Sequence, residues 1–64
     1  MYIIWLQGFK TEGYYRYEEN GSIHITNYVP DARKFPSESA ARDKAFMLMH
    51  DPDVMSYEIV RYRG

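Results

Sequence analysis

The tripeptide Glu19-Asn20-Gly21 places the strongest constraint on what this chain can fold into. It stands between two segments, residues 14–18 and 23–29, that are rich in aromatic and β-branched side chains. Asn-Gly between two such segments is a strong signal for an antiparallel hairpin, because both residues tolerate the positive φ angles of a tight turn. We therefore expect two paired strands here, and we expect Pro30 to end the second one because proline has no N–H to donate to a ladder.

The register of this hairpin decides which side chains face the core, since a slip of one residue moves every side chain to the other face of the sheet. A two-residue turn would place charged side chains opposite aliphatic ones. A loop of three residues, 19–21, with glycine in the left-handed conformation avoids this conflict. Its register pairs Tyr17 with Ile23 and Tyr15 with Ile25, and we predict this three-residue loop.

Three other segments complete the predicted secondary structure. Residues 2–9 form a continuous apolar run of strand length, which is typical of a strand in the interior of a sheet. Ser37 is a favourable N-cap for a helix over residues 38–50, and Pro52 ends that helix. Residues 56–62 have the composition of a last strand.

One stripe of the predicted helix is expected to face the sheet, because its members recur at helical spacing. The stripe consists of Ala41, Ala45, Leu48 and Met49, and Phe46 flanks it. Its two alanines would let the helix lie close to the sheet, whereas Met47 points to the opposite side. Phe35, in the connector before the helix, is expected to reach the core.

We expect one α+β domain over residues 1–64 with the element order β-β-β-α-β. A three-stranded antiparallel meander comes first, and the one helix packs on one face of the sheet. Because the helix reverses the chain, we predict that the final strand runs parallel to the first. The apolar first strand suits an interior position, which favours the sheet order 3-2-1-4 over the alternative order 1-2-3-4.

The size of the chain limits its stability. A protein of 64 residues buries only about 60% of its unfolded surface, so we expect its core to supply roughly 3–5 kcal/mol. Disulfides and structural zinc are not expected, because the sequence has no cysteine and only two histidines. Seven tyrosines, three phenylalanines and one tryptophan offer another source of buried area, at ~150–250 Å² each.

Charge and hydropathy argue against several classes of protein. Eight basic and nine acidic side chains give a net charge of −1, which argues against binding through a polyphosphate backbone. No run of about 18 apolar residues occurs, so we expect no membrane span. The first residues lack the basic segment and the cleavage site of a signal peptide, and we expect a cytoplasmic protein.

No motif of a known catalytic apparatus is present, such as a P-loop, a nucleophile elbow or a dinucleotide fingerprint. Asp51 and Asp53 are interpreted as a solvated helix stop, because a metal site needs further oxygen ligands. His24 lacks the partner and the cavity that a general base requires, and His50 suits the negative end of the helix dipole. We expect no enzyme activity, no cofactor, no metal site and no small-molecule substrate.

The sheet face opposite the helix is left uncovered in the predicted fold, and it is our candidate binding surface. The candidate partner-binding residues are Tyr14, Arg16, His24 and Thr26, with Tyr28 at the end of the strand. Tyrosine and arginine are enriched at the hot spots of protein interfaces. The same pattern also describes a platform on which the bases of single-stranded nucleic acid stack, and these residue types are equally common on solvated strand faces.

Residues 31–41 (DARKFPSESAA) resemble a recurring pattern in short bacteriophage-encoded accessory proteins of β-β-β-α-β type, in which an Ala-x-x-Phe connector leads to the head of a helix. The opening residues 1–4 (MYII) and the closing strand 57–61 (YEIVR) are similar to the same proteins. Most of these proteins have no known function, and those with one often bind and inhibit a host enzyme. The resemblance therefore implies a phage or mobile-element origin and a host protein as partner.

The expected function is that of a small, non-enzymatic protein-binding module that modulates a host protein in the host cytoplasm by covering part of its surface. Two alternatives stay open. The first is a binder of single-stranded nucleic acid that uses the same aromatic face. The second is a structural homodimer, in which two sheets or two sheet edges pair and bury the exposed aromatic side chains.

Overall fold

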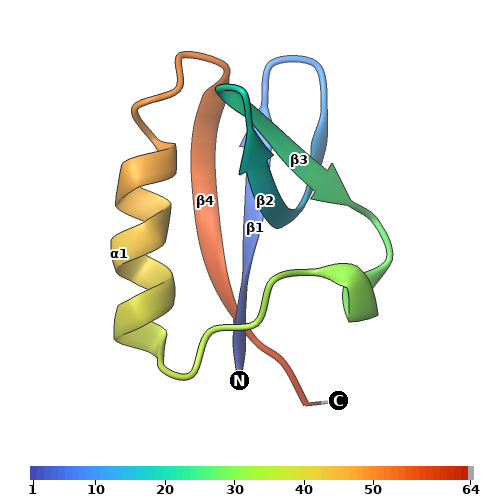
Figure 1. The fold of residues 1–64 in the computed structure, drawn as a ribbon, viewed down its shortest axis with the longest axis vertical. Helices are drawn as coiled ribbons and strands as arrows, with labels where there is room; N and C mark the ends of the chain where they lie inside the picture. The colour runs from blue at the N-terminus through green and yellow to red at the C-terminus, as the bar shows by residue number, and fades with distance from the viewer. Residues whose placement is uncertain (64) are drawn as a thin grey trace.

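The computed structural model describes residues 1–63, which form a four-stranded sheet and one α-helix (Figure 1). The elements are β1 (Tyr2–Gly8), β2 (Glu12–Glu19), β3 (Ser22–Thr26), the 3-10 helix η1 (Val29–Asp31), α1 (Glu38–Leu48) and β4 (Val54–Arg61). The order of strands in the sheet is β3-β2-β1-β4. The predicted α+β class, element order and sheet order are therefore confirmed. Among the described residues, no helix is long and apolar enough to cross a membrane.

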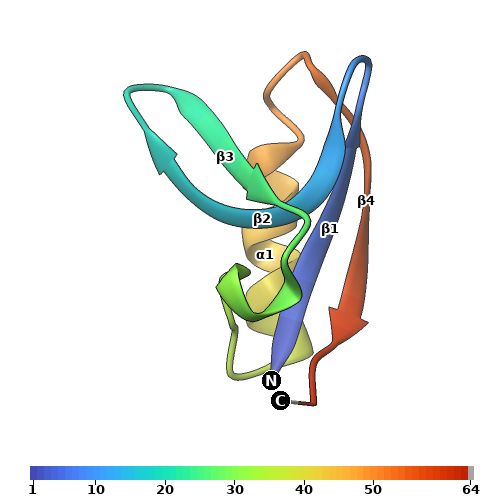
Figure 2. The ribbon, with the colours of Figure 1, turned by 90° about the vertical axis from the view of Figure 1, so that its right-hand side faces the viewer.

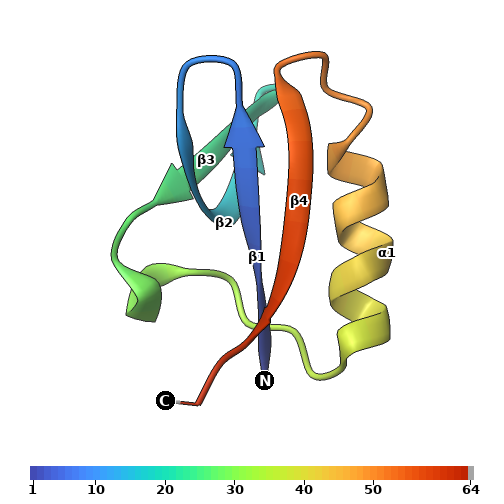
Figure 3. The same cartoon turned by 180° about the vertical axis from the view of Figure 1, so that it is seen from behind.

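The predicted direction of the last strand was wrong, because β4 pairs antiparallel to β1. The arrow of β1 points up in Figure 3, whereas that of β4 points down in Figure 2. The reason lies in the connector, residues 27–37, which can span roughly 35 Å when extended and so exceeds the 29 Å length of the molecule. It carries the chain back to the start of β1, where Phe35 pairs with Tyr2, before α1 begins. The helix therefore runs alongside β1 in the same direction, and β4 returns against it.

The hairpin turn also differs from the prediction. Asn20 and Gly21 have φ angles of 52° and 79°, and Glu19 pairs with Ser22, so the turn has two residues. A β-bulge at Arg16, where the register shifts by one residue, removes the predicted opposition of Arg16 to Ile25, whereas Glu18 still pairs with Ile23. As a result Tyr15 pairs with Ile25 as predicted, whereas Tyr17 pairs with His24 and not with Ile23.

The β2–β3 hairpin curls away from the first half of β1, and the connector fills the space that it leaves (Figure 2). The Arg33 N–H donates to the Tyr15 carbonyl oxygen at 2.9 Å. Tyr2 and Phe35 exchange two backbone hydrogen bonds, of 2.9 and 2.8 Å. Phe35 is buried and stacks on Tyr15 with ring centroids 6.4 Å apart, which confirms that it anchors the connector.

The core lies between the sheet and α1 and is made of alternate residues of each strand. Its buried members are Ile4, Leu6, Tyr15, Phe35, Ala41, Ala45 and Leu48. Three of the four predicted helix positions are thus buried, while Met49 caps the helix C-terminus and is 36% exposed. Phe46 and Met47 are exposed, the latter as predicted.

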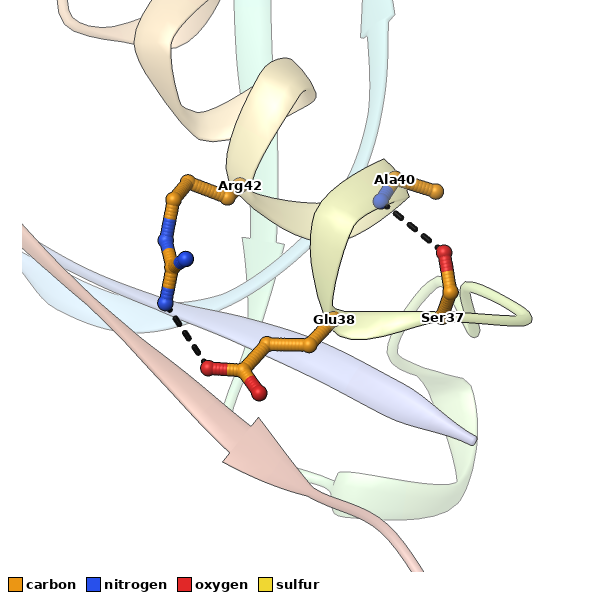
Figure 4. A network of polar contacts seen from close by, with 4 residues as sticks. All are labelled: Ser37, Glu38, Ala40 and Arg42. Atoms are coloured by element: carbon orange, nitrogen blue, oxygen red, sulfur yellow. Dashed lines mark hydrogen bonds and ion pairs between the residues drawn. The ribbon is translucent and has the colours of Figure 1, made fainter.

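The helix begins where the sequence predicted and ends two residues earlier. The Ser37 hydroxyl accepts a hydrogen bond of 3.1 Å from the Ala40 N–H, and Glu38 forms an ion pair of 2.7 Å with Arg42 (Figure 4). Such a cap satisfies one of the free N–H groups of the first turn. At the other end, α1 stops at Leu48 and a short turn leads past Pro52 into β4.

Candidate functional site: an aromatic face of the sheet

The face of the sheet turned away from α1, here called the open face, carries a row of rings from three strands. Trp5 lies on this face because its neighbours Ile4 and Leu6 both point into the core. Tyr14 is its cross-strand partner, and His24 stands between two residues that pack against the core. Tyr17 joins the row because the bulge pairs it with His24. We call Trp5, Tyr14, Tyr17 and His24 the aromatic row.

The rings of the aromatic row are held in two pairs. Trp5 and Tyr14 meet edge to face, with centroids 4.9 Å apart and planes at 71°. Tyr17 and His24 are stacked, with centroids 4.5 Å apart and planes at 12°. Such ring pairs stabilise by about 0.5–1.5 kcal/mol beyond the area that they bury. Both pairs therefore restrict the side chains to defined orientations before any partner binds.

Arg16 places a positive charge at one end of the row. It is the extra residue of the bulge, and its guanidinium carbon lies 5.3 Å from the centroid of the Tyr17 ring. A guanidinium at this distance from a ring face is attracted to it by about 0.5–1 kcal/mol at an exposed site. Bulges often re-aim side chains next to functional sites, and here the bulge brings Arg16 and Tyr17 together.

The structure brings together most of the predicted binding residues. Tyr14 and Thr26 face each other across β2 and β3, His24 lies beside them, and Arg16 adjoins the row. Tyr28 stands apart, because it lies beyond the end of β3, where its N–H donates to the Thr26 hydroxyl at 2.9 Å. It is 64% exposed and is not a member of the aromatic row.

Sequence reasoning missed Trp5 and Tyr17. Trp5 was hidden in the continuous apolar run 2–9, although its place between the core residues Ile4 and Leu6 would have assigned it to the other face by simple alternation. Tyr17 was assigned to the core side because the bulge at Arg16 was not foreseen. No simple sequence pattern predicts such a bulge. However, the two-residue register placed charged side chains opposite aliphatic ones, which indicated that the strand pairing had to shift.

Part of the open face is covered by the connector, which corrects the prediction that the whole face is uncovered. Ile3 alternates with the core residue Ile4 and so lies on the open face, yet it is only 1% exposed. In Figure 2 the connector with η1 passes in front of the sheet, whereas α1 lies behind it. Ala32 in this connector is buried as well. The connector therefore covers the lower end of the face, and the aromatic row occupies the part that stays open.

A polar cluster on the other face ties the hairpin to the helix. The Glu18 carboxylate forms an ion pair with Lys44 of α1 and accepts a hydrogen bond of 3.2 Å from the Tyr15 hydroxyl. The hydrogen bond from Lys44 lowers the pKa of Glu18 and raises that of Lys44. Burial raises the pKa of Tyr15. The cluster is explained by packing of the hairpin on the helix, so it needs no catalytic role.

A pocket of about 320 Å³ lies between the hairpin tip and the turn that precedes β4, with Asp51 and Asp53 in its lining. The Asp51 carboxylate accepts a hydrogen bond of 2.9 Å from the Asp53 N–H, which closes the turn and agrees with the interpretation as a helix stop. Within residues 1–63 no group of three or more His, Cys, Asp or Glu side chains is placed to hold a metal ion.

The comparisons with known proteins add no family. No protein-family model matches the chain, and searches of curated proteins and of solved structures found no significant match. The open face is therefore interpreted from its own chemistry.

Proposed function

We propose that this chain is a non-enzymatic protein-binding module that docks on its partner through the open face. The observation that carries the proposal is the aromatic row beside Arg16, half-buried except for the exposed Tyr17, on the part of the sheet face that neither α1 nor the connector covers. Tyrosine, tryptophan and arginine are the residues most enriched at binding hot spots. The resemblance of residues 31–41 to phage accessory proteins supports a host protein in the host cytoplasm as the partner.

The mechanism is steric. The ring pairs fix the side chains in advance, so binding immobilises few additional rotamers and loses little entropy. A partner footprint of about 800 Å² would cover most of one face of a domain this small. A protein docked there would mask a surface of its target, which is sufficient to modulate or inhibit the target without any catalysis.

A protein partner is favoured over single-stranded nucleic acid by the arrangement of the rings. Bases bind by stacking on free aromatic faces within a positively charged groove. Tyr17 and His24 already stack on each other, and the Trp5–Tyr14 pair is edge to face. The net charge of −1 also gives little attraction for phosphates. Nucleic-acid binding would be recognised by affinity that falls steeply with salt.

The test is an affinity capture from bacterial lysate with and without nuclease treatment, comparing the wild type with the double variant Arg16→Ala/Tyr17→Ala. We expect one stoichiometric protein to be captured by the wild type and its recovery to fall at least tenfold with the variant, since hot-spot truncations cost about 2 kcal/mol or more. Phe9→Ala is the matched control, because Phe9 is an aromatic residue that is 70% exposed in the turn after β1, outside the aromatic row.

Two results would overturn the proposal. One is equal capture of the protein by the double variant and by the wild type, with both folded as judged by Trp5 fluorescence. The other is capture that disappears with nuclease treatment, which would assign the open face to nucleic acid. Loss of fold in the double variant would contradict the assignment of these two side chains to an exposed surface.

A further inference from the structure

Strand β4 lies at the edge of the sheet and leaves one side of its backbone without a neighbouring strand. The Tyr62 N–H donates to the Met1 carbonyl oxygen at 2.8 Å, so these residues form a hydrogen-bonded pair. In an antiparallel ladder such pairs alternate with non-bonded pairs. Along the continuous register of β1 and β4, the backbone N–H and C=O groups of Tyr57, Ile59 and Arg61 therefore point away from β1.

This edge has few of the features that keep edge strands from pairing. Natural edges are usually short, or carry lysine, proline or a covering segment. β4 has eight residues with neither lysine nor proline, and nothing in the described part of the chain hydrogen-bonds to its outward N–H groups. Its bulge, at Met55 between the Gln7–Ser56 and Gly8–Val54 pairs, is confined to the start of the strand. Residues 56–61 therefore present a regular, unpaired edge.

An apolar surface borders the edge on the helix side. Phe46 of α1 meets Tyr57 of β4 edge to face, with ring centroids 6.0 Å apart, and Phe46 is 56% exposed. A strand added to this edge would cover these side chains while its backbone satisfied the outward N–H and C=O groups.

We propose that β4 pairs antiparallel with β4 of a second copy of this chain, about a two-fold axis at Ile59. Each Ile59 would face the partner's Ile59, and each Tyr57 would face the partner's Arg61. The first pair is aliphatic, and the second sets a guanidinium beside an aromatic ring, which is attractive. Glu58 would face the partner's Val60, so no like charges meet.

The other registers of self-pairing are less favourable. An axis at Glu58 would place two carboxylates directly opposite each other, which destabilises a strand pair. An axis at Tyr57 would extend the pairing into Val54, where the register with β1 shifts. Of these three axes, only the one at Ile59 confines the pairing to residues 56–62. This self-complementarity distinguishes a second copy from an unrelated extended peptide as the occupant of the edge.

The test is sedimentation equilibrium from micromolar to millimolar concentration with three proteins. The wild type is expected to form a dimer. Arg61→Pro removes an outward N–H but none of the bonds to β1, so it should raise the dimer Kd about tenfold or more by deleting two of about six inter-chain hydrogen bonds. Arg61→Ala keeps the N–H and serves as the control, with a smaller loss from the missing Tyr57 contact.

Cross-linking tests the register, since the sequence contains no cysteine of its own. Oxidised Ile59→Cys is expected to give a disulfide-linked dimer, because paired Cα atoms lie about 5.5 Å apart. Met47→Cys, on the exposed side of α1, is the control and should stay monomeric on the same gel. The dimer is also expected to survive Arg16→Ala/Tyr17→Ala, which separates this proposal from docking on the open face.

Three outcomes would overturn the proposal. The first is a wild-type protein that stays monomeric at millimolar concentration. The second is a dimer whose Kd is unchanged by Arg61→Pro in a variant that retains the native Trp5 emission. The third is protection of the β4 amides from hydrogen exchange only when another protein is added, which would give the edge to a different occupant.

Discussion

Glu18 links the hairpin to the helix through one carboxylate. It forms an ion pair with Lys44 of α1 and accepts a hydrogen bond from the partly buried Tyr15 hydroxyl. The pKa of Glu18 lies below its unfolded value of 4.5, so the folded state gains stability above that pH and loses it as the pH falls through the folded pKa. The pKa values of Lys44 and Tyr15 are raised, so their contributions are present below about pH 10 and are lost as the pH rises further.

Replacing Glu18→Gln should therefore destabilise the protein at pH 7, and the difference should shrink as the pH falls below the folded pKa of Glu18, because the protonated carboxyl is then as neutral as the glutamine amide. The ion pair is more than one third exposed on both sides, so the expected loss at pH 7 is below about 1 kcal/mol. Urea unfolding followed by Trp5 fluorescence measures it. Glu58→Gln, a strand carboxylate without an ion pair among the described residues, is the control. An equal loss at pH 3 would show that packing and not charge is involved.

The contact between helix and sheet depends on small side chains. Ala41 and Ala45 are fully buried against β1 and β4, and Leu48 fills the end of the same stripe. An alanine in this position allows close approach of the helix axis to the sheet, and the interior has no spare volume to accept a larger group. The packing of α1 on the sheet therefore depends on the close fit of these side chains as much as on the apolar area that they bury.

We expect Ala45→Leu to destabilise the fold by about 1–3 kcal/mol, because the added side chain would force α1 away from the sheet. Met47→Leu is the matched control, since Met47 is 66% exposed on the opposite side of the same helix and its replacement should change stability by no more than about 0.5 kcal/mol. Both are measured by thermal or urea unfolding. A neutral Ala45→Leu would contradict close packing at this position.

Signals within a few residues of sequence predicted the helix and strands well. Features that depend on contacts between distant residues were harder to predict. Ser37 and the buried alanines could be identified from the sequence because capping and helical periodicity act within a few residues. The direction of β4 could not, because it depends on Phe35 pairing with Tyr2 across about half of the chain. Of the candidate site, Tyr14, His24 and Thr26 were placed on the open face. Tyr17 was not, because a bulge depends on competition between turn geometry and burial.

At the scale of the whole molecule, the open face and the β4 edge are different surfaces, and the two proposals fit together. Paired residues in a ladder point to the same face of a sheet. A dimer through β4 would therefore place both helices on one face of a joined sheet and both aromatic rows on the other. Such an assembly would offer two docking sites on one side, which increases avidity for a partner that is itself dimeric.

The central claim is that a protein partner docks on the aromatic row, and Trp5 allows it to be tested directly. It is the single tryptophan of the chain and belongs to the row. The measurement is Trp5 emission during titration with the purified captured protein, corrected for that protein's own fluorescence. We predict a saturable blue shift that the Arg16→Ala/Tyr17→Ala variant loses and Phe9→Ala retains. Binding that saturates while the Trp5 emission stays unchanged would place the interface elsewhere and contradict the account.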